Sequence, residues 1–160
     1  LAMERVSSTK FLGVHITEDL TWTTNVTSLN KKGQQCLHFL RRLKRASLPP
    51  PILTTFYRGT IGSVLTSCIT VWYGNCSAAD RRTLQPTVNT AAKIIGAPLP
   101  SILDIFLARC SSKASSILKD PTNPSHNLFQ LLPSARSVRF LNSFFPQAMR
   151  VLNSNLPVPH

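Results

Sequence analysis

Acidic residues are scarce in this chain of 160 residues. There are six of them against eighteen lysines and arginines, which gives a formal net charge of +12. The six are scattered, and no two stand in an apolar strand where they could hold paired metal ions for phosphoryl transfer. The chain is therefore not expected to be an enzyme on its own. A cationic surplus of this size indicates a polyanionic partner, nucleic acid before membrane, or else a small domain that is simply basic.

The motifs of several common chemistries are missing as well. The sequence has no glycine-rich dinucleotide loop, no P-loop and no Gly-x-Ser-x-Gly elbow. Its four cysteines form no Cys-x-x-Cys pair and have no histidine at ligand spacing, so neither a metal nor another cofactor is expected. Three of the cysteines lie in apolar helical patterns and are predicted to be buried free thiols: Cys36, Cys68 and Cys110.

The chain opens without a secretory signal, which favours an intracellular, reducing compartment. It begins at Leu1 and is expected to be a fragment of a longer protein. The most apolar stretch, Pro51–Tyr73, repeats its apolar residues at steps of three and four, as a buried helix does. Arg58 and two glycines within it argue against a membrane span, although membrane association through this stretch stays a weaker alternative.

The pattern predicts a mainly α fold, with an N-terminal β-hairpin followed by about four main helices packed as a thumb-like bundle. The expected domains are an N-terminal segment with the hairpin (1–22), a helical domain (23–119) and a loosely structured tail with short helices (120–160). In the hairpin, residues 11–16 form one strand, 17–19 the turn and 20–22 the returning strand.

Four helices are expected from caps and breakers. The first begins at Thr23 or Thr24 and ends near Ala46, with Gly33 as a weak point, and the second is Pro51–Tyr73. The third begins with a Ser77-Ala-Ala-Asp80 capping box, kinks at Pro86 and ends at Gly96. The fourth follows Ser101 and ends near Lys119, and one more short helix is expected between Phe140 and Asn153.

The first of these helices carries the candidate binding residues. Six of the eighteen cations stand within fifteen residues without an acid among them: Lys31, Lys32, Arg41, Arg42, Lys44 and Arg45. Like charges at this density destabilise a helix unless an anion relieves the repulsion. A surface that follows a phosphate backbone is therefore predicted, with a solvated helix face as the alternative.

The segment Lys10–Trp22, which begins Lys-Phe-Leu-Gly-Val-His-Ile, resembles the region after the catalytic core in reverse transcriptases of non-LTR (LINE-type) retrotransposons of the fish type. The likeness continues in order through further pieces: Phe39–Leu43, Phe56-Tyr57, Trp72–Ser77, Pro124–His126 and Ser143–Ala148. It implies a primer grip at Phe11, Leu12 and Gly13, a thumb that holds an RNA–DNA or DNA duplex with low sequence specificity, and a nuclear location. The family's metal-binding acids lie upstream of this segment, so polymerisation is not implied.

Three alternatives stay open. The chain is a structural module that docks on a missing upstream polymerase core, or a relic without function. Its helical segment also resembles the small domain at the N-terminus of AlkB-like tRNA-modifying dioxygenases. That activity needs a His-x-Asp…His iron site, which neither His15-Ile16-Thr17 nor His126-Asn127-Leu128 supplies. Only the non-catalytic domain is therefore implied by this second resemblance.

Overall fold

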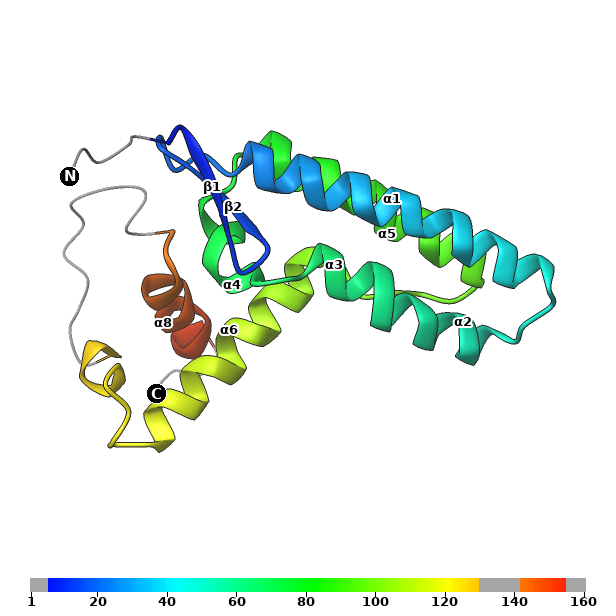
Figure 1. The fold of residues 1–160 in the computed structure, drawn as a ribbon. Helices are drawn as coiled ribbons and strands as arrows, with labels where there is room; N and C mark the ends of the chain where they lie inside the picture. Colours follow the sequence, from blue (N-terminus) through cyan, green and yellow to red (C-terminus); the bar gives the residue numbers. More distant parts are fainter. Residues whose placement is uncertain (1–5, 130–141, 155–160) are drawn as a thin grey trace. The chain divides into compact units, whose positions relative to one another are not determined.

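The computed structural model describes residues 6–129 and 142–154 (Figure 1). It confirms the predicted class, since a two-stranded hairpin precedes a series of helices. Its contacts divide the chain into two compact units. The first unit comprises the described residues up to Ile69 together with Cys76–Ile102. The second comprises Thr70–Asn75 and the described residues from Leu103 onward. Of the expected tail (120–160), residues 130–141 and 155–160 lie outside the described residues.

The hairpin consists of β1 (Ser8–Phe11) and β2 (Val14–Thr17), which pair antiparallel with Phe11 opposite Val14. Leu12 and Gly13 form the two-residue turn, with φ of 47° and 85°. Positive φ at both positions gives a turn whose twist matches that of the flanking strands, and glycine adopts it without strain. The predicted strand across residues 11–16 and the returning strand 20–22 are therefore wrong, because the chain already reverses at Leu12-Gly13.

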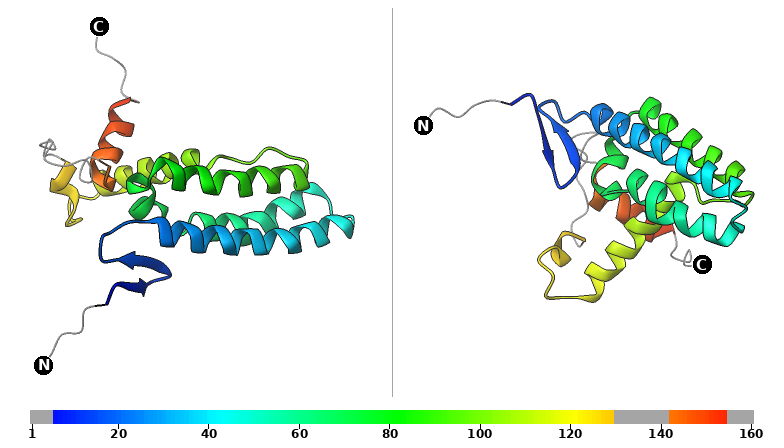
Figure 2. Two further views of the ribbon diagram at one scale, coloured as in Figure 1. Left: turned by 90° about the horizontal axis from the view of Figure 1, so that it is seen from above. Right: turned by 45° about the vertical axis from the view of Figure 1, so that its right-hand side comes forward.

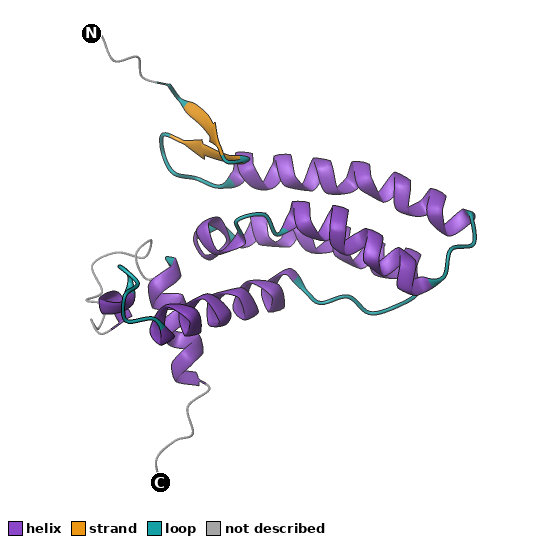
Figure 3. Cartoon of the chain, turned by 60° about the horizontal axis from the view of Figure 1, so that its bottom comes forward, coloured by secondary structure: helices purple, strands orange, loops and turns teal. Residues whose placement is uncertain are grey.

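Helix α1 (Thr23–Arg45) is the long helix that follows the hairpin (Figure 3). Neither Thr23 nor Thr24 caps it, because the helix begins after Trp22 without a side-chain cap. The hydroxyl of Thr23 instead donates to the carboxylate of Asp80, 3.1 Å away. Cys36, which was predicted to be buried, is only half-buried, as is Leu43. Four other apolar residues of α1 are buried: Val26, Leu29, Leu37 and Leu40.

The predicted helix Pro51–Tyr73 is interrupted. It consists of α2 (Pro50–Tyr57), a π-helical turn η1 (Arg58–Gly62), α3 (Ser63–Leu65), α4 (Ile69–Trp72) and the 3₁₀ turn η2 (Tyr73–Asn75). Prolines occupy its first positions, as the pattern predicted. No helix among the described residues is long and apolar enough to cross a membrane.

The interruption follows the spacing of the buried residues. Hydroxyls of Thr60, Ser63 and Thr66 donate to carbonyls four residues earlier, but those of Thr54 and Thr55 do the same within the regular helix α2. The buried residues here recur every four positions, which is more than one α-helical turn, and the wider π turn takes up the difference: Leu53, Tyr57, Ile61 and Leu65.

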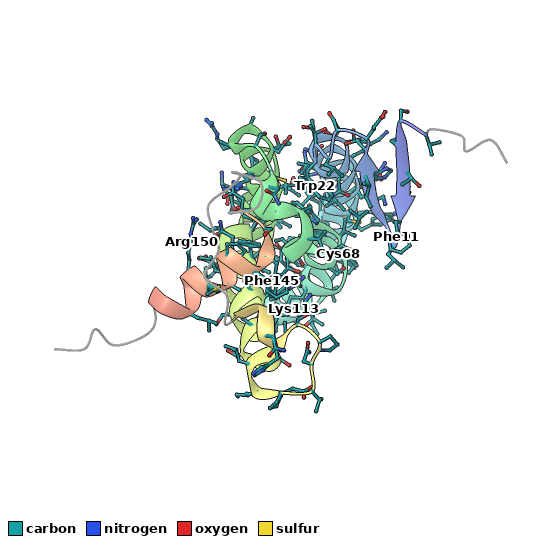
Figure 4. The ribbon with its side chains drawn as sticks, turned by 90° about the vertical axis from the view of Figure 1, so that its left-hand side faces the viewer. Phe11, Trp22, Cys68, Lys113, Phe145 and Arg150 are labelled. Carbon is teal, nitrogen blue, oxygen red and sulfur yellow. The ribbon has the colours of Figure 1, made fainter. Side chains whose placement is uncertain are left out.

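Cys68 lies between α3 and α4 and differs from its prediction. Its φ of 49° breaks the helix between α3 and α4. Its side chain is exposed rather than buried (Figure 4). The apolar periodicity had placed Cys68 on the buried side because it assumed an uninterrupted helix.

Helix α5 (Ala78–Ile95) begins and ends as its sequence signals predicted. The hydroxyl of Ser77 accepts a hydrogen bond from the Asp80 N–H at 3.0 Å, and Gly96 closes the helix in the left-handed conformation. The helix is continuous through Pro86, where a kink is predicted. Pro86 is exposed, so water can reach the carbonyl that lacks its helical N–H partner.

Helices α1 and α5 run parallel, side by side in each view of Figures 1 and 2. Two hydrogen bonds join them, Thr23 to Asp80 and Thr87 to Asn30, and both link residues 57 positions apart. Gly33 follows Asn30 by three residues, one turn further along α1. There the backbone of α1 comes close to the side chains of Leu65 and Thr87. The contact at Gly33 thus fixes which side of α1 faces inward.

The second unit is built on α6 (Ile102–Lys119), whose first residue still belongs to the first unit. The 3₁₀ turn η3 (His126–Phe129) and α8 (Phe144–Ser154) follow it. Ala114, Ile117 and Ala148 form a small core, and the ammonium of Lys113 lies 5.0 Å from the centre of the Phe144 ring. Figure 4 shows Lys113 with Phe145 and Arg150 in this unit. The end of α6 at Lys119 agrees with the sequence.

Replacing Gly33 with alanine is expected to destabilise the first unit by about 1–2 kcal/mol, although alanine has the higher helix propensity. The new Cβ would lie 2.9 Å from Cδ2 of Leu65, a fully buried side chain with little room to move. Urea denaturation followed by circular dichroism measures this change in the free energy of unfolding.

Gly59→Ala is the matched control, because a Cβ at this exposed position of η1 meets no atom within 4 Å. It is expected to leave the free energy of unfolding unchanged or to raise it by up to about 1 kcal/mol. A Gly33→Ala variant as stable as the Gly59→Ala variant would contradict the close approach at Gly33.

Candidate nucleic-acid interface

All six cations predicted to bind are exposed on α1. The helix contains no acidic residue along its whole length. None of the six side chains forms an ion pair or a hydrogen bond with another residue that the structure describes. No carboxylate among the described residues offsets their charges, so a polyanion would displace the solvent ions around them on binding.

The six cations do not share one side of α1. At about 3.6 residues per turn, one exposed side contains four basic residues, here called the basic stripe: Lys31, His38, Arg42 and Arg45. Arg41 borders this stripe. Lys32 lies on a neighbouring side of the helix. Lys44 is one turn after the buried Leu40 on the same side, and it is exposed.

A polar cleft lies along one flank of the basic stripe, between α1 and α5. Its volume is about 390 Å³, and Arg41 and Gln34 line it from α1. Pro86, Thr87 and Thr90 line it from α5. The Thr87 hydroxyl is engaged by Asn30 at 2.7 Å, which leaves the Arg41 guanidinium as the charged group of this cleft. Arg41 is thus placed to bind an anionic group.

An apolar hollow lies along the other flank, between α1 and the segment formed by α2 and η1. Its volume is about 620 Å³. Arg42 contributes the charged side chain of its lining, and the other lining residues are mostly apolar: Cys36, Phe39, Leu43, Ala46, Phe56 and Thr60. Phe39 stands out because 53% of its surface is exposed. Polar and apolar recesses therefore flank the same row of cations.

Sequence reasoning missed this hollow. Phe39 is apolar but lies off the buried side of α1, next to His38 and close to Arg41 and Arg42. The exposure of Phe39 could have been predicted from the sequence, because an aromatic residue that lies among exposed cations is not part of a core. The contribution of Phe56 depends on how α2 packs against α1, which local periodicity does not specify.

The residues predicted as a primer grip lie at the tip of the hairpin. Phe11 and Leu12 are 63% and 80% exposed, and Gly13 completes the turn (Figure 4). The backbone N–H of His15 donates to the buried side chain of Asn25 at 3.1 Å, which attaches the hairpin near the start of α1. Arg42 stands seventeen residues further along α1 than Asn25, or about 25 Å. The structure therefore does not bring the grip-like residues and the terminal arginines together.

A buried carboxylate holds the two parallel helices together. Asp80 is 8% exposed, and its Oδ2 accepts hydrogen bonds from the hydroxyls of Ser77 at 2.8 Å and Thr23 at 3.1 Å. Its role is structural, because it connects Ser77, the capping residue of α5, to Thr23 at the start of α1. The Asp80 carboxylate is thus already engaged.

The two buried cysteines, Cys76 and Cys110, are not activated nucleophiles, and the described part of the chain holds no cluster of metal ligands. Within residues 6–129 and 142–154, no three His, Cys, Asp or Glu side chains gather closely enough to hold a metal ion. Burial raises the pKa of Cys76 to about 12, with a smaller contribution from the Asp80 carboxylate. Burial likewise raises the pKa of Cys110 to about 11. Both thiols therefore stay protonated at neutral pH.

Residues 22–63 match the family model described as alkylated DNA repair protein alkB homolog 8, N-terminal. The match covers α1, α2 and η1, and it contains the whole basic stripe and both phenylalanines of the hollow. It supports the second resemblance drawn from the sequence. No curated protein and no solved structure matches the chain, so the resemblance to reverse transcriptases stays a prediction.

Alkylation of the native protein at about pH 8 is expected to modify Cys68 rapidly and to leave Cys76 and Cys110 largely unmodified. Cys68 is exposed, whereas about one in a thousand or fewer of the other two thiols is ionised at that pH. Mass spectrometry after timed exposure to iodoacetamide measures the three rates. In urea all three should react alike, and equal rates in the native protein would contradict the burial.

Proposed function

We propose that this chain is a non-catalytic module that binds nucleic acid through the phosphate backbone, with little dependence on base sequence. Arg41, Arg42 and Arg45 make the main contacts, and Lys31 extends the track toward the hairpin. Lys32 and Lys44 add charge from the neighbouring sides of the helix. Phosphate contacts of this kind position a nucleic acid without reading its sequence.

The observation that carries the proposal is the long, exposed and acid-free helix α1. A helix surface in contact only with solvent usually mixes charges of both signs, because neighbouring like charges repel. Four cations lie within Arg41–Arg45, and α1 contains no acidic residue that would offset their mutual repulsion. Each is accessible, and none has a carboxylate partner among the described residues. A phosphate backbone would supply the missing counter-charge.

The family match supports the same proposal. The matching family is named for a DNA repair protein, and the match includes every one of the six cations. We propose that this segment acts here as an accessory helical module of that kind. The duplex-holding thumb predicted from the reverse-transcriptase resemblance would use the same helix face.

Docking onto a protein partner is the second candidate function, favoured by the tip of the hairpin. Phe11 and Leu12 expose most of their surfaces there, and Val6 is exposed before the start of β1. Apolar docking predicts self-association of the isolated chain and a response to salt that is flat, because apolar contacts do not release counterions.

Binding to a nucleic acid is expected to weaken with salt at a log–log slope of about −5, as engagement of five to six phosphates requires. Replacing Arg41, Arg42, Lys44 and Arg45 together with alanine should reduce the magnitude of this slope by about 3–4, because each contact contributes about 0.9. Fluorescence anisotropy with a labelled RNA–DNA hybrid across a salt series measures both slopes.

A charge-matched control removes four exposed cations from other elements: Lys10, Arg82, Lys93 and Lys119. It carries the same net charge as the first variant and should keep a slope close to that of the wild type. If the salt slope falls equally in the two variants, the nucleic acid is attracted to the net charge of the protein and not to α1. No binding by a folded, monodisperse wild type would refute the proposed function.

A further inference from the structure

We propose that the apolar hollow beside α1 receives bases of a single-stranded nucleic acid whose phosphates follow the basic stripe. The proposal rests on the function proposed above and specifies its ligand. It assigns a role to Phe39 and Phe56, which line the hollow and which the phosphate contacts do not use.

The lining of the hollow suits a planar aromatic ligand. The ring of Phe39 is half-exposed and that of Phe56 is half-buried, and both border a space of about 620 Å³. That volume lies within the range of small-molecule pockets. Bases stack on aromatic side chains without regard to sequence, because every base has a π face. The hollow therefore matches the lack of sequence preference expected of the stripe.

The charges are placed on one side of the hollow. Arg42 belongs to the basic stripe and also lines the hollow, and the ring of His38 meets the ring of Phe39 edge-on at 5.7 Å. A single strand exposes phosphates along one edge and bases along the other. Its phosphates can therefore contact the basic stripe while its bases enter the hollow. A duplex stacks its bases inside and would leave the hollow empty.

The stripe has the length of a short strand. Lys31 and Arg45 are fourteen residues apart on α1, which spans about 21 Å. At about 3.4 Å per nucleotide of a stacked strand, this accommodates about six nucleotides. Arg41, on the opposite flank in the polar cleft, binds the phosphate edge and not the bases.

The test compares three labelled probes of about 12 positions, all with the same number of phosphates per strand: an oligo(dT) strand, an abasic strand, and a blunt duplex. The wild type is expected to bind oligo(dT) about five- to a hundredfold more tightly than the abasic strand, the range of one stacked base. Fluorescence anisotropy at one fixed salt concentration gives the three affinities.

Phe39→Ala is expected to lower the affinity for oligo(dT) to that for the abasic strand while the salt slope is unchanged. Phe39→Trp should restore the tight binding and show quenching by oligo(dT) that the abasic strand does not cause. Phe39→Leu, which stays apolar but cannot stack, should behave like Phe39→Ala. Because Phe39 lies at the surface, these variants should keep the circular dichroism of the wild type. Ile52→Ala is the control, an exposed apolar residue outside the hollow.

The outcomes separate this inference from the proposed function. If oligo(dT), the abasic strand and the duplex bind equally and with steep salt dependence, the phosphate track stands and the role of the hollow is refuted. If none of the probes binds, the proposed function itself fails. If Phe39→Ala removes self-association but not oligonucleotide binding, the hollow docks a protein, which also overturns the inference.

Discussion

The close approach at Gly33 is the contact on which the arrangement of the first unit depends. Because this residue has no side chain, α1 can lie directly against Leu65 of α3 and Thr87 of α5. The hydrogen bonds from Thr23 to Asp80 and from Thr87 to Asn30 then hold the two parallel helices in one register. Together they fix the rotation of α1 about its own axis.

That rotation decides which residues face solvent. With Val26, Leu29 and Leu40 turned inward, the basic stripe lies on the outer side, and the recesses form where α1 meets its neighbours. The polar cleft follows from packing against α5, and the apolar hollow follows from packing against α2 and η1. The electrostatic repulsion on α1 is therefore tolerated in a helix whose stability comes from its inner side.

Much of the fold could be predicted from local signals. Ser77 and Gly96 delimit α5 through capping chemistry, and the apolar steps of α1 identify its buried side. The failures in the hairpin and in the segment after Pro50 share one cause, since each followed from extending a local pattern too far. The segment after Pro50 is apolar enough for one helix, but its buried residues recur every four positions, and the chain forms a π turn and a break at Cys68.

Only part of the candidate interface could be predicted, because local patterns do not specify how the helices pack. A run of cations without acids is visible in the sequence, so Arg41, Arg42 and Arg45 could be named. Their separation into a stripe and two flanks depends on the rotation of α1 and on what packs beside it. The hollow next to Phe39 exists only once α2 has folded back along α1, and that is tertiary information.

The most direct test of the account is an NMR titration of the ¹⁵N-labelled protein with a short oligonucleotide. The account predicts that the largest amide shift changes fall on α1 between Lys31 and Arg45, with those of α6 nearly unchanged. Shift changes concentrated on α6 and α8, or at the hairpin tip near Phe11 and Leu12, would contradict the assignment of α1 as the binding surface.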